Sequence, residues 1–444
     1  MRDEDASRCS LVCSSCGLRM PDDGVSLECP GPHGPALLKS DYGDRPFAPD
    51  LGAAGIHRYR GWLPIRRAVA DTGRSIVYRS DRLGAFLGLK NLWIAFNGYW
   101  PERGAGLITG SFKELEAATV IGRLPEHAGT LVVTSAGNTA AAFAELCSVH
   151  GVPAVVIVPA DALGHLRSRV PYAQRSDAVR IVAVDRADYA DAIALGDALA
   201  QLPGFVPEGG TKNVGRRDGL GTVMLAAAEA MDGLPEHYVQ AIGSGAGAIA
   251  AHEAAVRLQR ASGSGDSRPL PRLMLAQNSG FAPVYEAWRT GRRPWETGGA
   301  DDDRAAARGA FAPELTNRKP PYDIPGGLRE TLTESAGEVF VADGSEARAA
   351  MATFLELEGI DIEPPAGVAL AALRTAVRDG RVDPAARILL NITGGGRARL
   401  AAEHRLVPNE PDLVVPRDAV HTRLAEIAEL TGPFTALSGQ AAGR

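Results

Sequence analysis

Short apolar runs alternate with alanine-rich stretches along most of the chain after about residue 70. Runs of this length that are rich in Val, Ile and Leu are typical of buried strands, and the stretches between them carry helical patterns. One such stretch, NTAAAFAELCSVHG, closes on Gly151, the kind of residue that commonly stops a helix. This alternation predicts an α/β fold with mostly parallel sheets, in which ligands bind beyond the carboxyl ends of the strands. We predict buried strands at residues 92–96, 130–134, 154–158, 180–184, 238–242, 273–277, 338–342 and 387–392.

The first 45 residues differ from this pattern and predict a separate small module. They hold four of the five cysteines and many turn-forming residues. Within the α/β part, residues 261–272, 291–309 and 318–328 are rich in Gly, Pro and charge, which predicts loops. The C-terminal part adds a closing loop and one amphipathic helix near 417–430.

Composition and charge exclude several classes of function. The chain has 444 residues, with 47 Lys and Arg against 53 Asp and Glu, so its formal charge is −6. A negative chain lacks the basic surface that binds nucleic acid. It contains no apolar run of the roughly 18–20 residues that span a membrane, and its polar first residues lack the apolar core of a signal peptide. Five cysteines are too few for a disulfide framework, so we expect a cytoplasmic protein.

The segment GLITGSFKELEAATVIGRL (106–124) places a lysine, Lys113, directly after a Gly-Ser turn at the start of a predicted helix. The positive end of a helix lowers the pKa of a nearby amine and keeps part of it neutral. Neutral amine is the form that condenses with a carbonyl group. The alternative is a solvated surface lysine at a helix start, which is the commoner case for a lysine taken alone.

A second segment, TLVVTSAGNTAAAFAEL (130–146), runs from a strand through Ser-Ala-Gly-Asn-Thr into a helix. The unpaired N–H groups of a first helical turn form an anion site that suits a carboxylate. Asn138 either caps this helix or donates a hydrogen bond to a ligand, and the segment alone does not separate the two roles.

A third segment, YVQAIGSGAGAIAAHEAA (238–255), has a strand, a glycine-rich turn and a helix, which together predict a phosphate cradle. Its spacing is G-x-G-x-G and not the G-x-G-x-x-G of dinucleotide folds, and the chain contains no P-loop motif. A tight strand–helix turn without a ligand is the alternative. The cradle residues are Gly243, Ser244, Gly245, Ala246 and Gly247.

A fourth segment, RILLNITGGGRARL (387–400), ends a buried strand in Thr393 and three glycines. A hydroxyl at the carboxyl end of a strand can reach a ligand crevice. If this hydroxyl is the partner of a heterocycle nitrogen, it does not favour full protonation of that nitrogen.

Taken together and in this order, the four segments resemble the pyridoxal-phosphate enzymes of fold type II, the tryptophan synthase β-like group that includes the threonine synthases. GIHRYRGWLP (55–64) is similar to a segment of threonine synthases. Other stretches are more similar to the related cysteate synthases, and the resemblance spans roughly residues 10–400. These stretches are FNGYWPERGA (96–105), SFKELEA (111–117), EGGTKNVGRRDGLGTVML (208–225), AIGSGAGAIAAHEA (241–254), AQNSGFAPVYEAW (276–288), LTNRKPPYDIPGG (315–327) and LLNITGGG (389–396).

The resemblance implies two three-layer αβα domains with pyridoxal 5'-phosphate between them, and a homodimer. On this basis we expect residues 46–112 and 206–444 to form the larger, cofactor-binding domain. Residues 113–205 would form a smaller, mobile domain. The first 45 residues would form a zinc-ribbon-like module, which also occurs in some threonine synthases.

The resemblance also implies an activity, because cysteate synthases replace the phosphate of O-phospho-L-serine with sulfite to give L-cysteate and phosphate. By the match, Lys113 is the Schiff-base lysine and moves the proton at Cα of the substrate. The other implied roles are Asn138 for the ring oxygen of the cofactor, residues 243–247 for its phosphate, Thr393 for its pyridine nitrogen, Ser135, Gly137 and Thr139 for the substrate carboxylate, and Thr211 and Arg216 for the substrate phosphate.

Three other functions stay open at this point. A threonine synthase acting on O-phosphohomoserine and water is one. Against it, the lysine is followed by Glu114-Leu115-Glu116, where threonine synthases have Asp-Arg. A related β-replacement enzyme of specialised metabolism, with another nucleophile, and a non-catalytic relative are the other two. Candidate charges for a second anion are Arg58, Arg103, Lys212 and Arg217, each of which is also compatible with an ordinary surface or structural role.

The N-terminal module contains a candidate structural zinc site. Cys13-x-x-Cys16 is followed by Cys29 and His33, with ligand types and spacing that a zinc ribbon tolerates. Cys9 is the alternative fourth ligand. Because so small a module has little core of its own, a metal would help it to fold. Few basic residues flank the cysteines, so we expect no role in nucleic-acid binding.

Overall fold

The computed structural model describes residues 9–262, 269–293, 295, 305–419 and 422–431. They belong to two compact units, and each is formed by two separate parts of the chain. The larger unit takes its residues from Met1–Glu126 and Gly209–Arg405, and the smaller unit from His127–Glu208 and Leu406–Arg444.

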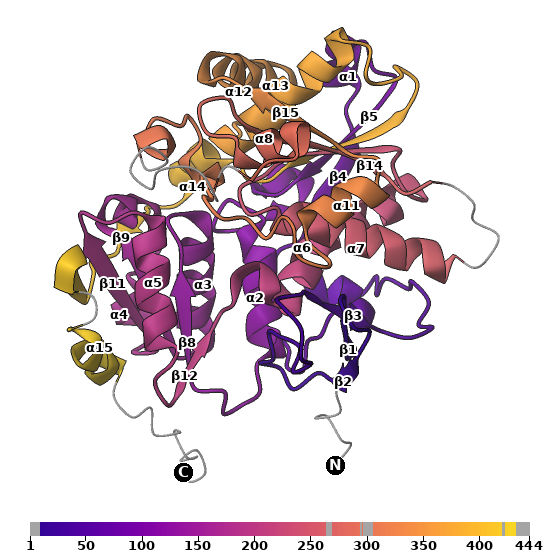
Figure 1. Cartoon of the computed structure of the whole chain (residues 1–444). Helices are drawn as coiled ribbons and strands as arrows, with labels where there is room; N and C mark the ends of the chain where they lie inside the picture. The colour runs from indigo at the N-terminus through magenta and orange to yellow at the C-terminus, as the bar shows by residue number, and fades with distance from the viewer. Residues whose placement is uncertain (1–8, 263–268, 294, 296–304, 420–421, 432–444) are drawn as a thin grey trace. The chain divides into compact units, whose positions relative to one another are not determined.

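A six-stranded sheet forms the centre of the larger unit (Figure 1). Its strand order is β15-β14-β13-β16-β5-β4, and all neighbours are parallel except β4 and β5. Five of the predicted apolar runs lie in it, because strands buried on both faces need continuous apolar sequence. The strands are β4 (Ile76–Arg79), β5 (Asn91–Phe96), β13 (His237–Ala241), β14 (Arg272–Asn278), β15 (Glu338–Ala342) and β16 (Arg387–Ile392).

Helices cover both faces of this sheet (Figure 1). α13 packs across β13 to β16 with α12 beside it, whereas α6 contacts β4 and β5 and pairs with α7 and α2. The unit is therefore three-layered, as predicted. Its helices are α1 (Asp81–Leu87), α2 (Lys113–Arg123), α6 (Val214–Met231), α7 (Ala246–Ala261), α8 (Pro283–Thr290), α11 (Leu328–Glu334), α12 (Gly344–Glu358), α13 (Pro364–Arg378) and α14 (Arg397–Glu403).

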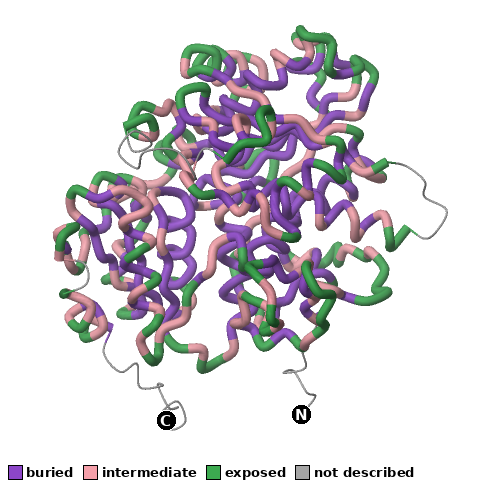
Figure 2. Tube along the Cα trace, in the orientation of Figure 1, coloured by how far each residue is buried: buried purple, intermediate pink, exposed green. Residues whose placement is uncertain are grey.

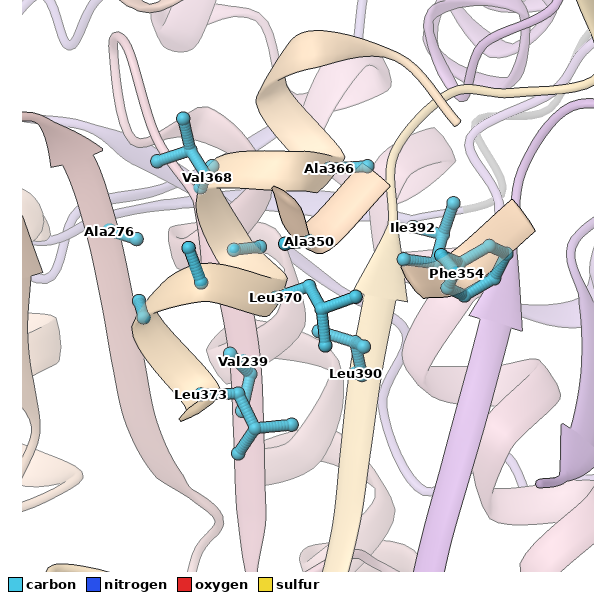
Figure 3. Close-up of a cluster of buried hydrophobic side chains, with 14 of the residues drawn as sticks. Val239, Ala276, Ala350, Phe354, Ala366, Val368, Leu370, Leu373, Leu390 and Ile392 are labelled. Carbon is cyan, nitrogen blue, oxygen red and sulfur yellow. The ribbon is translucent and has the colours of Figure 1, made fainter. Parts of the chain in front are cut away.

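The main core of the larger unit lies between this sheet and the α12–α13 pair (Figure 3). Leu370 and Leu373 of α13 pack with Leu390 of β16 and Val239 of β13, and all four are fully buried. Burying such side chains contributes about 1.5–3 kcal/mol each, so this layer fixes the positions of β13 and β16. Figure 2 shows that buried residues follow the strands, whereas exposed residues gather in connecting loops and at outer helix turns.

The N-terminal module is part of the larger unit. Its three antiparallel strands, β1 (Ser10–Cys13), β2 (Arg19–Pro21) and β3 (Leu38–Asp41), have the order β2-β1-β3. Its own core is small, and Leu11 and Leu38 pack against Val214 at the start of α6. The module is thus anchored on the helix that also carries Arg216. A 3₁₀ segment, η1 (Gly55–Trp62), follows it.

A five-stranded parallel sheet with the order β12-β8-β9-β11-β18 forms the centre of the smaller unit. Fully buried Val155, Ile157, Val182 and Val184 of its central strands pack with α5. Its strands are β8 (Thr130–Thr134), β9 (Ala154–Pro159), β11 (Val179–Asp185), β12 (Phe205–Pro207) and β18 (Leu413–Pro416), and its helices are α3 (Asn138–His150), α4 (Tyr172–Arg175), α5 (Tyr189–Leu199) and α15 (Leu424–Thr431).

Two short strand pairs complete the fold. β6 (Tyr99–Trp100) pairs with β7 (Ala105–Gly106), and β10 (Arg167–Ser168) pairs with β17 (Val407–Pro408). Among the helices that the structure describes, none combines the length and the apolarity that a membrane crossing requires.

The limits of the units differ from the predicted boundaries at two places. α2 belongs to the larger unit because it packs on α6, although we expected the smaller domain to begin at residue 113. The chain after Leu406 belongs to the smaller unit because β18 extends its sheet by parallel pairing with β11. The sequence patterns that we used report strands and helices but not which of them pair.

Local predictions also differ in detail. Residues 305–308, inside the predicted loop 291–309, are helical, whereas 294 and 296–304 lie outside the described residues. The same holds for 263–268 of the loop predicted at 261–272. The predicted helix near 417–430 is divided, since a 3₁₀ turn at Arg417–Ala419 precedes α15.

Candidate functional site

Lys113 is the first residue of α2, as predicted, and the end of β16 holds it in place. The N–H of Phe112 donates to the carbonyl oxygen of Thr393 at 2.9 Å, and Ser111 forms a bridge with Gly394. These contacts join the turn before α2 to the carboxyl end of a central strand. Lys113 is therefore positioned by backbone bonds on a rigid element, and Thr393 follows β16 at the same place.

The side chain of Lys113 is not a solvated surface group. It is 22% exposed, and its Nζ lies 3.2 Å from Oε2 of Glu116 and 4.8 Å from the ring centre of Phe112. The alternative of an ordinary surface lysine is therefore wrong. A partly accessible amine on a rigid element is suited to covalent attachment of a carbonyl compound.

Glu116 is a residue whose position our sequence reasoning missed. Its side chain is fully buried, and its second oxygen, Oε1, lies 2.9 Å from Nη1 of Arg216. One carboxylate thus joins the amine of Lys113 to the guanidinium of Arg216. The i,i+3 spacing of Lys113 and Glu116 on one helical face was a signal that could have been used.

Glu114 is equally buried and bonds to the preceding loop. Its Oε2 accepts hydrogen bonds from the backbone N–H of Thr109 at 2.9 Å and from Oγ1 of Thr109 at 3.0 Å. Two neighbouring glutamates on α2 therefore have different roles, one toward the preceding loop and one toward α6.

Arg216 and Thr211 lie at the start of α6, where we expected a phosphate-binding pair. Both are buried. Asn213 caps the helix, since its side-chain oxygen accepts a hydrogen bond from the N–H of Gly215 at 2.9 Å. Thr211 lies in the preceding 3₁₀ turn, Gly210–Lys212. The cap fixes the first turn of α6 and with it the guanidinium that meets Glu116.

The glycine-rich turn 243–247 connects β13 to α7, as predicted. Gly245 has φ +80°, a conformation that favours glycine. Within the described chain, the N–H groups of Gly243, Ser244 and Gly245 have no hydrogen-bond acceptor. A Cβ atom at Gly247 would lie 2.6 Å from Nε2 of Gln240. Open N–H groups at the N-terminus of α7, in a turn whose glycine positions have no room for a side chain, fit the phosphate of a cofactor.

This turn and Thr393 lie at the same edge of the sheet. β13 and β16 are parallel neighbours, with Val239 paired to Leu390, so their carboxyl ends adjoin. Thr393 is buried, and a Cβ atom at Gly394 would overlap the carboxylate of Glu363. The larger unit thus brings together Lys113, Glu116, Arg216, Thr211, Thr393 and the turn 243–247.

The remaining predicted site residues belong to the smaller unit. Ser135 and Gly137 follow β8, and Oγ of Ser135 accepts a hydrogen bond from the N–H of Gly137 at 3.2 Å. α3 begins at Asn138, with Gly137 in the N-cap position. Asn138 is therefore not the N-cap, and the capping role is wrong. Thr139 is in the first turn of α3, and Ser135, Asn138 and Thr139 are buried.

The candidate charges for a second anion all have other contacts. Arg217 is fully buried and bonded to Glu253, Arg58 pairs with Glu229, and Lys212 pairs with Glu28. Arg103 lies 4.1 Å from the ring centre of Tyr78 and 4.7 Å from that of Trp100. These contacts support the structural role that we gave as the alternative.

The N-terminal cysteines form a cluster that fits a metal. One ligand atom from each of Cys13, Cys16, Cys29 and His33 lies within 4.8 Å of the others. Sγ of Cys13 is 3.4 Å from Nε2 of His33, and the Sγ atoms of Cys16 and Cys29 are 3.7 Å apart. Tetrahedral zinc with bonds of about 2.3 Å to sulfur separates its ligand atoms by about 3.8 Å.

The contacts of His33 and Cys9 decide the fourth ligand. Nδ1 of His33 lies 2.7 Å from the carbonyl oxygen of Gly34 and donates to it, which leaves Nε2 facing the sulfur atoms. Such a bond orients metal-binding histidines. Cys9 is outside the cluster, and its Sγ lies 3.9 Å from Asp22. His33 and not Cys9 therefore completes the set.

Comparison with known proteins gives a family for this arrangement. Residues 71–394 match the family described as "Pyridoxal-phosphate dependent enzyme". The chain is similar to the cysteate synthase of Methanosphaerula palustris, with 47% identity over 91% of this chain and 94% of the relative. It is also similar to those of Methanoregula boonei, with 45% identity over 91% and 94%, and Methanothrix thermoacetophila, with 44% identity over 95% and 99%.

Solved structures support the fold alone. Maize serine racemase superimposes with a TM-score of 0.55 at 20% identity and covers 73% of this chain and 89% of its own. A pyridoxal 5'-phosphate-dependent aspartate racemase gives a TM-score of 0.54 at 17% identity, with 73% and 90% covered. Both likenesses agree with a fold type II architecture.

Proposed function

Because the chain belongs to the cysteate synthase family of pyridoxal-phosphate-dependent enzymes, we propose that it replaces the phosphate of O-phospho-L-serine with sulfite. The products are L-cysteate and inorganic phosphate. That the protein is an enzyme and that its cofactor is pyridoxal 5'-phosphate follow from the family. The choice of substrate and nucleophile is the proposal.

One observation carries this proposal, namely the carboxylate of Glu116 between Lys113 and Arg216. Oxygen–nitrogen distances of 3.2 and 2.9 Å place the two cations on either side of one buried group. A guanidinium is the side chain best suited to a phosphate dianion, since it offers several donors in a fixed plane. An arginine coupled to the reactive amine favours a substrate whose leaving group is a phosphate.

The residues of the larger unit divide the work of the reaction. Bound pyridoxal phosphate supplies an electron sink for the charge that develops at Cα. Lys113 holds the cofactor and takes the proton from Cα of the substrate at its Nζ. Arg216 and Thr211 hold the phosphate as it departs with the electrons of the Cβ–O bond. Lys113 then returns the proton to Cα once the sulfur of sulfite has bonded to Cβ.

Other residues orient the cofactor and the substrate. The turn 243–247 binds the cofactor phosphate through its open N–H groups, and the hydroxyl of Thr393 meets the pyridine nitrogen. In the smaller unit, Asn138 serves the ring oxygen of the cofactor. Ser135, Gly137 and Thr139 serve the carboxylate of the substrate. These assignments rest on the motif match and on the buried setting of these residues.

The alternative is a threonine synthase acting on O-phosphohomoserine and water, and the residues after Lys113 argue against it. Glu114 and Leu115 stand where threonine synthases have Asp-Arg. This departure lies directly beside the reactive lysine. A relative that uses another nucleophile would share all of these contacts, so only the product distinguishes it.

The test is a comparison of substrates with the purified holoenzyme. O-phosphoserine, O-phosphohomoserine and O-phosphothreonine are each incubated with and without sulfite, and the amino-acid product is identified by its mass. We expect phosphate release and cysteate only with O-phosphoserine and sulfite together. Sulfite-independent phosphate release from O-phosphohomoserine would overturn the proposal in favour of a threonine synthase.

A further inference from the structure

A cavity of about 770 Å³ lies in the larger unit between the N-terminal module and α7. It is lined by residues 12–14, Arg19 and residues 39–45 of the module, and by Trp62, Glu334 and one face of α7. None of the residues assigned to the reaction lines it. The proposed chemistry therefore does not account for this cavity.

One wall of the cavity is rigid. The guanidinium of Arg257 lies 4.7 Å from the ring centre of Tyr42 and 5.7 Å from that of Trp62. Its Nη2 also donates to Oδ1 of Asp218 at 2.8 Å. Cation–π contacts and an ion pair thus hold α7, β3 and η1 around a preformed space. A preformed cavity binds a small molecule at a lower ordering cost.

Two arginines that line the cavity are candidates for holding an anion. Within the described chain, neither Arg45 nor Arg260 has a carboxylate within 4.0 Å, and the nearest to Lys39 is Glu330 at 3.9 Å. Most of the lining acids have a cationic partner or a histidine partner. Asp41 pairs with Arg19 and Glu253 with Arg217, whereas Glu334 contacts His252, which is charged only when protonated. Arg45 and Arg260 are thus the lining cations that can hold an anionic ligand.

Arg217 connects the cavity wall to the proposed phosphate site. This fully buried guanidinium donates from Nε to Glu253 of α7 at 3.0 Å and from Nη2 to the carbonyl oxygen of Leu38 in β3. Its Nη1 donates to the carbonyl oxygen of Thr211. Arg217 is therefore bonded to both walls of the cavity and also to the backbone of Thr211.

Asp218, the next residue of α6, adds a second connection. Its carboxylate accepts hydrogen bonds from Oγ of Ser40 at 2.5 Å, from the hydroxyl of Tyr42 at 2.7 Å and from Arg257 at 2.8 Å. All three donors line the cavity. The first turn of α6 thus presents Arg216 to Glu116, and Arg217 and Asp218 to the cavity walls.

We propose that this cavity is an effector site for a small anionic metabolite, held by Arg45 and Arg260, and that its occupancy changes the binding of the substrate phosphate at Arg216. The coupling runs through the first turn of α6, because a shift of either cavity wall moves Arg217 or Asp218. The binding step stands on the cavity alone, whereas the coupling rests on the proposed function.

The binding test uses calorimetry on the holoenzyme with three probes, L-cysteate, L-aspartate and inorganic phosphate. The test variant is Arg45→Ala/Arg260→Ala. The control is Arg289→Ala/Arg378→Ala, which removes two exposed arginines that do not line the cavity. We expect at least one probe to lose a binding event in the test variant and to keep it in the control. L-cysteate or L-aspartate binding without phosphate binding would identify an amino acid as the ligand, and phosphate binding would identify a bare anion.

The site is ruled out if all three probes bind the test variant and the control alike. Circular dichroism and the cofactor absorbance of the test variant are measured beside the titrations, and both are expected to equal those of the wild type. Arg45 and Arg260 are exposed, so their loss removes no buried contact.

The coupling test measures the KM for O-phosphoserine with and without the bound probe. We expect a change of about fivefold in the wild type and none in the test variant, whose basal kcat and KM stay unchanged. Binding without any change in KM would overturn the coupling. If O-phosphoserine is not a substrate, the proposed function fails while the calorimetric result stands, so the two failures are distinguishable.

Discussion

The two ends of α2 hold buried charge in opposite ways. At its C-terminal end, Arg123 is 1% exposed and Asp22 3%, and the guanidinium donates from Nε and Nη2 to that carboxylate. Its remaining donors meet Oδ1 of Asn213 and the carbonyl oxygen of Ser26. At the N-terminal end, Lys113 is 22% exposed and shares one carboxylate, Glu116, with Arg216.

The difference separates a structural ion pair from a reactive one. At the Arg123 end one cation meets one anion and every donor group has an acceptor, which is the arrangement that lets a buried pair persist. At the Lys113 end the amine and the guanidinium of Arg216 both contact the carboxylate of Glu116, and the amine is partly accessible. An accessible amine beside a guanidinium suits an anionic cofactor and an anionic substrate. The same helix therefore anchors the N-terminal module at one end and carries the chemistry at the other.

The largest effect is expected at the reactive end. Replacing Lys113 with alanine should lower the rate of product formation by about 10³-fold or more, because both the covalent attachment and the proton transfer are lost. The melting temperature of the chain should change little. Lys90→Ala, at an exposed lysine, is the control for both measurements. Activity within tenfold of wild type in Lys113→Ala would show that the assignment is wrong.

At the structural end of α2, the Arg123–Asp22 pair, the expected effect is on the stability of the fold. Asp22→Ala leaves Arg123 buried without its ion-pair partner, which should cost about 3–5 kcal/mol of unfolding free energy. Glu286→Ala is the control, since it removes an exposed pair with Arg289 and should cost about 1 kcal/mol or less. Urea titration measures both. Equal midpoints for the two variants would contradict the distinction between the ends.

Two neighbouring glutamates give a finer comparison. Glu116→Gln removes the charge shared by Lys113 and Arg216 and should lower kcat/KM about tenfold or more, because both cations lose this counter-charge. Glu114→Gln removes an equally buried carboxylate that contacts Thr109, and its kcat/KM should stay within about threefold of wild type. Steady-state kinetics measure kcat/KM of both variants. Equal losses of kcat/KM would contradict a special role of Glu116.

The next prediction concerns the metal cluster of the N-terminal module, which also provides Asp22. It asks whether bound zinc stabilises this module. Cys16→Ser should lose bound zinc, measured by elemental analysis, and should lower the melting temperature of the larger unit. Cys9→Ser should keep its zinc, because Cys9 contacts Asp22 and is not a ligand. Zinc retained in Cys16→Ser and lost in Cys9→Ser would place Cys9 and not Cys16 among the ligands.

The last prediction concerns pH and an acid beside the glycine turn. Burial raises the pKa of Glu314 to about 7, and its Oε2 has no hydrogen-bond partner among the described residues. Because the folded pKa lies above the unfolded one, this carboxyl destabilises the fold progressively as pH rises from about 4.5 through 7. Glu314→Gln should therefore be more stable than wild type at pH 8 and equal at pH 4, measured by urea titration. A difference independent of pH would contradict the burial of a charge.

Much of the fold was predictable because its signals are local. The eight apolar runs all became strands, since continuous Val, Ile and Leu over five or six residues satisfy a strand buried on both faces. The turn before Lys113, the glycine turn after β13 and the stop at Gly151 were predictable for the same reason. Each depends on residues that adjoin in the sequence.

The rest depends on contacts between distant segments. Glu116 meets Arg216 only because α2 packs on α6, and Arg123 meets Asp22 across 101 positions of the sequence. The choice of His33 over Cys9 depends on where the module's loops bring the two side chains. The assignment of residues after Leu406 to the smaller unit follows from the pairing of β18 with β11. No periodicity in the sequence contains this information.

The most direct test of the account is the attachment site of the cofactor. The purified holoenzyme is reduced with borohydride and digested, and the peptides are mapped by mass. We predict one pyridoxyl modification, on Lys113, in the peptide that covers the start of α2. An unmodified Lys113, with the label absent or on another lysine, would contradict the central claim.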